Sequence, residues 1–153
     1  MPREKINIPP GKMWKIRSDR KPPMGNWTYG TKAEIKPGTK LLFLAGAVPM
    51  DANGNIVGVG DLKAQYKQCI ENIKIVLEAE GATLHDIVLE NKYTTDVAGL
   101  MRLGEWRTKE YPEIKGKEVG DQTGAPGLTA GVTRLCDPDQ LIEVQVMAVV
   151  HPK

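Results

Sequence analysis

The sequence predicts an α+β domain of two layers, in which two helices cover one face of a mixed β-sheet. The predicted elements follow the order β-β-α-β-α-β-β along the chain. Each helical segment has a single apolar stripe and therefore buries one side against a sheet. The last strand, residues 141–150, has one wholly apolar face, whereas its other face carries Glu143 and Gln145. We therefore expect both helices on the apolar face and an uncovered second face.

Composition places the chain among soluble globular domains of ordinary size. It has 153 residues, of which 41% are hydrophobic and 26% charged, enough for one hydrophobic core. The net charge of +2 is too small to indicate nucleic acid or an anionic membrane as a partner. No apolar run reaches membrane-spanning length, no signal-type segment follows the charged start, and two cysteines give no disulfide framework. We therefore expect a cytoplasmic protein without nucleic-acid or membrane partners.

Residues 1–26 are predicted to form an extended basic arm, and residues 27–153 the folded domain. A continuous helix is excluded in the arm by its prolines, which are Pro2, Pro9, Pro10, Pro22 and Pro23. Two interpretations exist for Trp14 and Trp27: they stack on RNA bases, or they anchor the arm to its own domain or to a neighbouring subunit. The low net charge favours the second interpretation.

The sheet is predicted to begin with strands at residues 29–35 and 40–46. The second strand is a short apolar run that ends at the pair Ala45-Gly46. Such a small pair either lets a ligand or another backbone come close or is a simple bulge. Asn53-Gly54 is the strongest turn signal of the chain, and residues 56–58 are predicted to be a brief return strand.

The surest helix begins after Asp61, a typical N-cap, and is closed by Gly81. Its stripe recurs at spacings of three and four and consists of Leu62, Tyr66, Ile70, Ile73 and Leu77. Cys69 flanks this stripe, so we predict a buried structural thiol rather than a nucleophile.

A strand at residues 87–94, a helix at residues 97–111 and a strand at residues 128–135 complete the middle of the chain. Asp96 is the predicted N-cap of this helix, and Pro112 is predicted to stop it. Residues 112–127 form either a lid over a site or an ordinary surface loop. The two histidines lie near no acidic or cysteine cluster, so we predict no metal site, and we expect no cofactor.

Glu143 is the residue of the last strand that needs an explanation. A carboxylate on a partly apolar sheet face is either solvated or buried against another polar surface, because an unpaired buried charge is costly. Leu141, Met147 and Val149 lie on the same face and favour covering it. Self-association into a closed ring would cover the face, and Glu143 would then lie in or near a cleft between subunits.

Four segments occur together in the order and spacing of a known family. They are the run LFLAGAVP at residues 42–49 with the turn that follows it, the helix QYKQCIENIKIVLEAEG at residues 65–81, the helix start Thr95-Asp96-Val97, and residues 132–135 leading to Glu143. In these segments the chain resembles the Rid superfamily of reactive intermediate deaminases, which are YjgF/RidA-like. The resemblance implies a fold similar to that of chorismate mutase and a homotrimer with three clefts between subunits.

The resemblance also implies a set of site residues. Glu143 matches a catalytic glutamate that orients the hydrolytic water in deaminase members. Tyr29 and Tyr93 match aromatic residues of the cleft, and Thr129 matches a position whose backbone N–H meets the substrate. Gly127 stands where the deaminase subgroup has an arginine that holds the substrate carboxylate. The chain is therefore identified as a divergent member without this arginine.

The resemblance implies a hydrolase that deaminates an enamine or imine of a small metabolite and releases ammonia. A backbone cannot replace the charge-assisted hydrogen bonds of a planar guanidinium, so we expect an altered substrate specificity. A cation of the loop, Lys115 or Lys117, is a candidate substitute. Two alternatives stay open: a non-catalytic metabolite-binding or regulatory trimer of the same fold, and a pathway enzyme whose substrate lacks a carboxylate or presents it differently.

Overall fold

The computed structural model describes residues 4–6, 28, 30–116 and 124–152 of the chain. Tyr29, Trp14, Trp27 and Lys117 lie outside the described residues, as does most of the predicted N-terminal arm. The described part of that arm, Glu4–Lys5 (β1), pairs antiparallel with Thr31–Lys32 (β2) in a separate two-stranded sheet. The strand predicted at residues 29–35 is therefore shorter than expected and does not belong to the main sheet.

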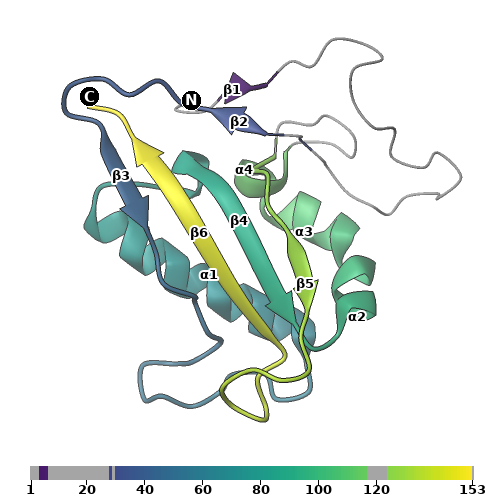
Figure 1. The fold of residues 1–153 in the computed structure, drawn as a ribbon. Helices are drawn as coiled ribbons and strands as arrows, with labels where there is room; N and C mark the ends of the chain where they lie inside the picture. The colour runs from purple at the N-terminus through teal and green to yellow at the C-terminus, as the bar shows by residue number, and fades with distance from the viewer. Residues whose placement is uncertain (1–3, 7–27, 29, 117–123, 153) are drawn as a thin grey trace, which may run out of the picture.

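The main sheet has four strands in the order β3-β6-β4-β5 (Figure 1). They are Lys40–Phe43 (β3), Ile142–Val150 (β6), Ile87–Thr94 (β4) and Thr129–Gly131 (β5). The pairs β3–β6 and β6–β4 are antiparallel, whereas β4–β5 is parallel. The helices lie together behind the sheet in the view of Figure 1. The predicted two-layer α+β fold with a mixed sheet is thus confirmed.

The first helix, Leu62–Ala79 (α1), forms as predicted. The Asp61 carboxylate accepts a hydrogen bond from the N–H of Ala64 at 3.0 Å and so caps the first turn. Gly81 has a positive φ of 72° just beyond the last turn, where an L side chain would be strained. The apolar stripe of α1 is buried except for Leu62, which is partly buried, and each of Ile70, Ile73 and Leu77 contributes about 1.5–3 kcal/mol by leaving water.

The helix predicted at residues 97–111 is divided into two. Val97–Arg102 (α2) is capped by the Asp96 side chain, as expected, and Gly104–Glu110 (α3) follows after one residue. Glycine has low helix propensity, which accounts for the break at this point. The helix α3 ends at Glu110, just before Pro112 as predicted, and Pro112 then begins a further short helix, Pro112–Lys115 (α4), where its missing N–H is not needed.

Several predicted strands are shorter in the structure. The return strand at residues 56–58 is only an isolated bridge between Met50 and Ile56, and the strand at residues 128–135 retains three residues. Residues 84–86 form a short 3-10 helix, Leu84–Asp86 (η1), closed by a capping box between Thr83 and Asp86. Turn chemistry explains these differences, because local side-chain hydrogen bonds compete with sheet pairing.

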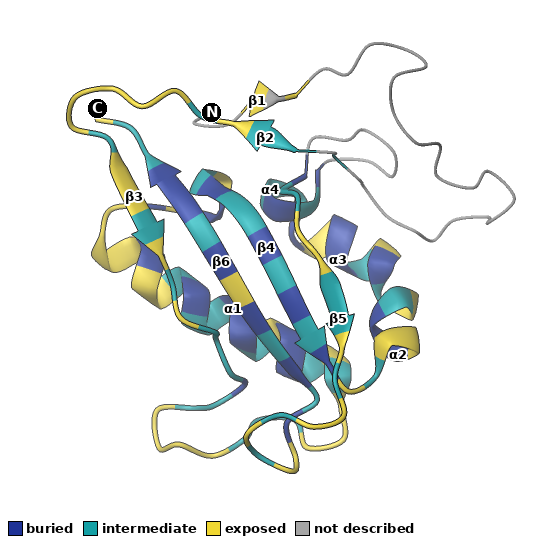
Figure 2. Ribbon diagram, viewed as in Figure 1, coloured by how far each residue is buried: buried dark blue, intermediate teal, exposed yellow. Residues whose placement is uncertain are grey.

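The two faces of β6 have the predicted characters (Figure 2). The side chains that face the helices are almost completely buried, namely Ile142, Val144, Val146 and Ala148. On the other face, Gln145 is exposed, and Glu143 and Met147 are half-buried. This face, which we call the open face, also carries Phe43. Phe43 is 68% exposed, and it is the register partner of Met147 on β6.

Among the described residues, no helix is long and apolar enough to cross a membrane.

Candidate active site

Glu143 and Tyr93 lie side by side on the open face. They are register partners between β6 and β4, and Ala130 of β5 is in turn the register partner of Tyr93. Directly opposed residues of paired strands project from the same face of a sheet, so the three form one row across it. The catalytic glutamate and the cleft tyrosine implied by the resemblance are thus neighbours, although they are 50 residues apart in sequence.

The carboxylate of Glu143 occupies the space above Gly46. A Cβ at position 46 would collide with Oε1 of Glu143, so glycine at this position leaves room for the carboxylate where it lies. The other oxygen, Oε2, accepts a hydrogen bond of 3.4 Å from Nε2 of Gln140. The small pair at the end of the second strand therefore makes room for a side chain of the protein's own last strand, and the glutamate is held at the sheet surface by one amide.

Cys69 lies beneath this part of the sheet on α1. Its thiol is fully buried and donates weakly to the carbonyl oxygen of Ile142 at 3.9 Å. Burial, together with the negative charge of Glu143, raises the pKa of this thiol to about 12. A thiol that stays protonated is not a nucleophile, so Cys69 is a structural residue, as predicted.

Gly127 and Thr129 lie elsewhere, beside a cavity of about 480 Å³ on the helix side of the sheet. Lys92, Arg107 and Lys115 also line this cavity. The backbone of Gly127 passes so close to the carbonyl group of Glu90 that a Cβ at position 127 would collide with it. No side chain fits there, which accounts for the glycine at the position where the resemblance implies an arginine.

The backbone N–H of Thr129 points away from the sheet. Leu128 accepts a hydrogen bond from the N–H of Lys92, and Val132 donates one to the carbonyl group of Thr94, each at 2.9 Å. Alternate residues of a strand direct their backbone groups to the same side, so Leu128 and Val132 face β4 and Thr129 faces outward. Since β5 is an edge strand, the N–H of Thr129 is directed to the uncovered edge.

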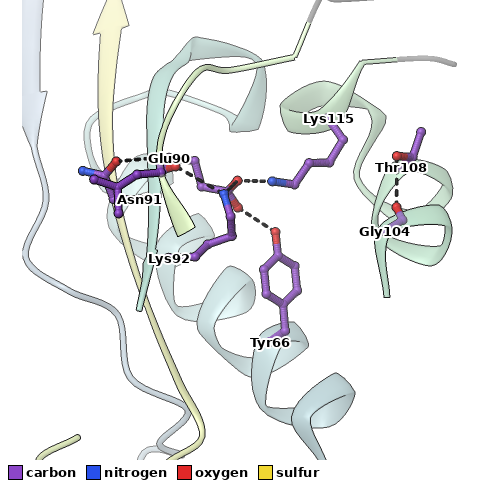
Figure 3. Close-up of polar contacts among 8 residues, drawn as sticks. Tyr66, Glu90, Asn91, Lys92, Gly104, Thr108 and Lys115 are labelled. Carbon is purple, nitrogen blue, oxygen red and sulfur yellow. Dashed lines mark hydrogen bonds and ion pairs between the residues drawn. The ribbon is translucent and has the colours of Figure 1, made fainter. Parts of the chain in front are cut away.

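A buried cluster of charges adjoins the cavity (Figure 3). Glu90 is fully buried, and its carboxylate pairs with Lys115 and, at 2.8 Å, with Lys92. The Tyr66 hydroxyl donates to the same carboxylate at 2.6 Å. Burial acts to raise the pKa of Glu90, but the ammonium groups of Lys115 and Lys92 outweigh burial and hold this pKa well below its usual range. Glu90 is therefore an anion at neutral pH.

Comparisons with known proteins show the family of the chain. A family model described as Endoribonuclease L-PSP matches residues 21–150. The chain belongs to this family, the Rid superfamily. A RutC family protein of Pyrococcus horikoshii is 31% identical over 126 residues, which are 82% of this chain and 88% of the relative. The 3-aminoacrylate deaminase RutC of Acinetobacter baylyi is 28% identical over 127 residues, covering 83% of this chain and 89% of that protein.

Solved Rid structures share the fold. A Rid protein of unknown function from Yersinia pestis, YyfB, superposes with a TM-score of 0.70 at 28% identity and covers 98% of this chain and 100% of its own. RidA from a Psychrobacter species superposes with a TM-score of 0.59 at 20% identity and covers 83% of this chain and 90% of its own. The second likeness concerns the fold only.

Sequence reasoning missed Glu90 and Lys92 in this Rid protein. Strict alternation along β4 places Ile87 and Glu90 on opposite faces, so the charged residues are expected in solvent. A register shift between Ile87 and Leu89 changes the face, and Glu90, Lys92 and Thr94 point inward instead. The sequence contains no signal for this bulge.

Among the described residues, no group of three or more His, Cys, Asp or Glu side chains is placed to hold a metal ion.

Proposed function

We propose that this Rid protein is a hydrolase that deaminates an enamine or imine of a small metabolite and releases ammonia. The observation that carries the proposal is the position of Glu143, which lies half-buried on the open face, above Gly46 and beside Tyr93. One hydrogen bond from Gln140 leaves acceptor positions on this carboxylate for a water. The relative named 3-aminoacrylate deaminase supports this reaction class.

The reaction needs one base and one bound water. An enamine first takes a proton on carbon and becomes an iminium, which is already electrophilic. Water then adds to the C=N carbon while the Glu143 carboxylate accepts its proton. Glu143 then gives this proton to the nitrogen of the carbinolamine, and the C–N bond breaks as ammonia leaves. The hydroxyl proton of the carbinolamine passes to the solvent, which replaces the proton that the enamine carbon took up. A carbonyl compound and a deprotonated Glu143 remain, so the cycle closes without a cofactor.

We place the cleft between subunits of a homotrimer. Within one chain, Glu143 and Tyr93 lie on the open face, whereas Gly127 and Thr129 lie at the β5 edge beside the helix-side cavity. Within a single subunit the two groups thus face different sides of the sheet. A ring that sets the β5 edge of one subunit against the open face of the next would bring them together and would cover Phe43.

A non-catalytic, metabolite-binding trimer is the second candidate function. The observation that favours it is the close approach of Gly127 to Glu90, because this approach excludes the arginine expected in the deaminase subgroup. Such a trimer would bind its ligand in the same cleft without releasing ammonia.

Ammonia release from 3-aminoacrylate and from 2-aminoacrylate, both generated in situ, tests the proposal. We expect turnover by the wild-type chain and a loss of about 100-fold or more in Glu143→Gln, which keeps the shape but removes the base. Glu78→Gln, the same change at an exposed position of α1, serves as the matched control and should keep full activity. Equal activity of Glu143→Gln and the wild type would overturn the role of Glu143. Release of ammonia by neither protein would favour the binding function.

A further inference from the structure

The cavity beside α2, α3, α4 and β5 has an excess of positive charge. Lys92, Arg107 and Lys115 line it, and among the described residues the carboxylate that pairs with this group is that of Glu90. Among the described residues of the cluster, three basic groups therefore face one carboxylate. The side chains of Lys92 and Lys115 are only 10% and 13% exposed, so water screens these charges poorly.

Two buried nitrogens of Arg107 have no hydrogen-bond partner in the described part of the chain. It is 7% exposed, and no described residue accepts a hydrogen bond from its Nε or Nη1. Its guanidinium lies over the ring of Tyr66, 5.6 Å from the ring centre, which satisfies none of these N–H groups. An arginine cannot lose its charge at ordinary pH, and a buried unpaired donor is costly. The guanidinium therefore has N–H groups available to donate hydrogen bonds to an anion.

The surroundings of Lys115 show the same excess of positive charge. Burial lowers its pKa well below the usual value for lysine, Lys92 and Arg107 act in the same direction, and Glu90 acts against them. A second anion near its ammonium group would offset these effects. Figure 3 shows the Lys115 side chain reaching from α4 toward Glu90 and Lys92 on β4.

The remaining wall of the cavity is largely apolar, although Thr28, Thr108 and Thr129 also line it. Val97, Met101, Ala125, Pro126 and Leu128 line it together with the cations. Its volume, about 480 Å³, lies in the range of about 300–1,000 Å³ that small-molecule sites occupy. An inorganic ion would leave most of this space unfilled, whereas a molecule with a charged head and a short apolar body fits both parts of the wall.

We propose that this cavity binds a small organic oxyanion, whose head contacts Arg107 and Lys115 and whose apolar body packs against Val97, Met101 and Pro126. The guanidinium fork matches the planar oxygens of a carboxylate and those of a phosphate ester. Within one subunit, this cavity and Glu143 lie on opposite faces of the sheet. The proposal therefore does not rest on deamination by Glu143.

Titration calorimetry with hexanoate and hexyl phosphate tests the proposal, with hexanamide as the uncharged analogue. We expect at least one of the two anions to bind at least tenfold more tightly than hexanamide, and the tighter of the two identifies the head group. Glu143→Gln should bind this anion like the wild type, so a failure of the deaminase proposal would leave the result intact. Equal affinities for the anions and hexanamide, or no binding of either anion, would overturn the proposal.

Two variants locate the bound head group. We expect Arg107→Met and Lys115→Met each to weaken binding of the anion at least tenfold, because each removes one cation and keeps an unbranched side chain. Lys109→Met, at an exposed position of the same helix as Arg107, is the matched control and should bind normally. Wild-type affinity in both cavity variants would show that the anion binds elsewhere. If either variant does not fold, a rise in the melting temperature of the wild type with the anion, and none with hexanamide, remains as the deciding measurement.

Discussion

Glu143 and Glu90 are carboxylates on adjacent strands whose surroundings differ completely. Glu90 is buried, and its carboxylate forms ion pairs with Lys92 and Lys115 and accepts a hydrogen bond from the Tyr66 hydroxyl. Both of its oxygens therefore have partners. Glu143 is half-buried and receives one amide hydrogen bond, so it retains room for a water. Glu143 is therefore suited to proton transfer, whereas Glu90 holds the interior charges together.

Substitution of Gly46 by alanine should impair the reaction while keeping the fold. The added Cβ meets the carboxylate of Glu143, which is the far end of a flexible side chain and can move aside. Displacing a base by about 1 Å costs about 100-fold in rate. We expect ammonia release to fall by this order in Gly46→Ala, with little change in the free energy of unfolding. A variant with unchanged kcat/KM would show that this carboxylate position is not needed.

Substitution of Gly127 by alanine should instead destabilise the fold. Its Cβ meets the backbone carbonyl group of Glu90, which cannot move without disturbing the 2.9 Å hydrogen bond between the Glu90 N–H and Pro126. We expect a loss of about 1–3 kcal/mol in urea unfolding. Gly131→Ala is the control, because its Cβ would meet only a methyl group of Val97. A larger loss at position 131 than at position 127 would contradict this account.

The ion pairs of Glu90 make stability depend on acidity. Between its lowered native pKa and its ordinary pKa of 4.5, the unfolded chain binds more protons than the folded one. The free energy of unfolding should therefore fall as the pH decreases from about 5 to about 3. In Glu90→Gln this part of the fall should disappear, whereas Glu78→Gln should keep it. Urea unfolding at several pH values measures the slopes, and equal slopes in all three proteins would contradict the prediction.

The elements follow local signals where those signals are strong. Asp61 and Asp96 cap their helices as predicted, and the positive φ of Gly81 follows the end of α1. The signals near residues 103–112 are weaker, and there the chain forms two short helices instead of the one predicted, followed by the further short helix α4. Lys115 reaches Glu90 because α4 turns the chain back toward the sheet, so this break also positions the charged cluster.

Removal of the first of these caps should have a measurable cost. In Asp61→Ala the N–H of Ala64 loses its side-chain acceptor at the start of an 18-residue helix. We expect a loss of about 1 kcal/mol in the free energy of unfolding. Glu78→Ala, at an exposed position of the same helix, should change it much less. Equal effects of the two substitutions would show that the cap is not important for α1.

The molecule as a whole has one sheet face covered by helices and one that is not. Exposed apolar side chains lie on the second face and at its β3 edge, including Phe43 at 68% and Leu41 at 48% exposure. A surface of this kind favours association. The proposed trimer would cover it and would unite the two groups of predicted site residues.

A charge placed on the open face should prevent the proposed association. We expect the wild type to have the mass of three chains by light scattering after gel filtration, and Phe43→Asp to have the mass of one. Ile75→Asp is the matched control, because this residue of α1 is equally exposed, at 66%, but lies on the helical side. A single-chain mass for the wild type, or a trimeric Phe43→Asp, would contradict the proposed arrangement.

Periodicity and capping residues in the sequence were sufficient for the two-layer fold, for α1, and for the two faces of β6, because these features depend on neighbours within a few residues. The resemblance singled out Glu143 and Tyr93, but only strand register makes them neighbours. The cluster of Glu90, Lys92, Arg107 and Lys115 was not predictable, since it depends on a bulge in β4 and on a break between short helices. Both come from long-range packing, which overrides the local alternation of a single strand.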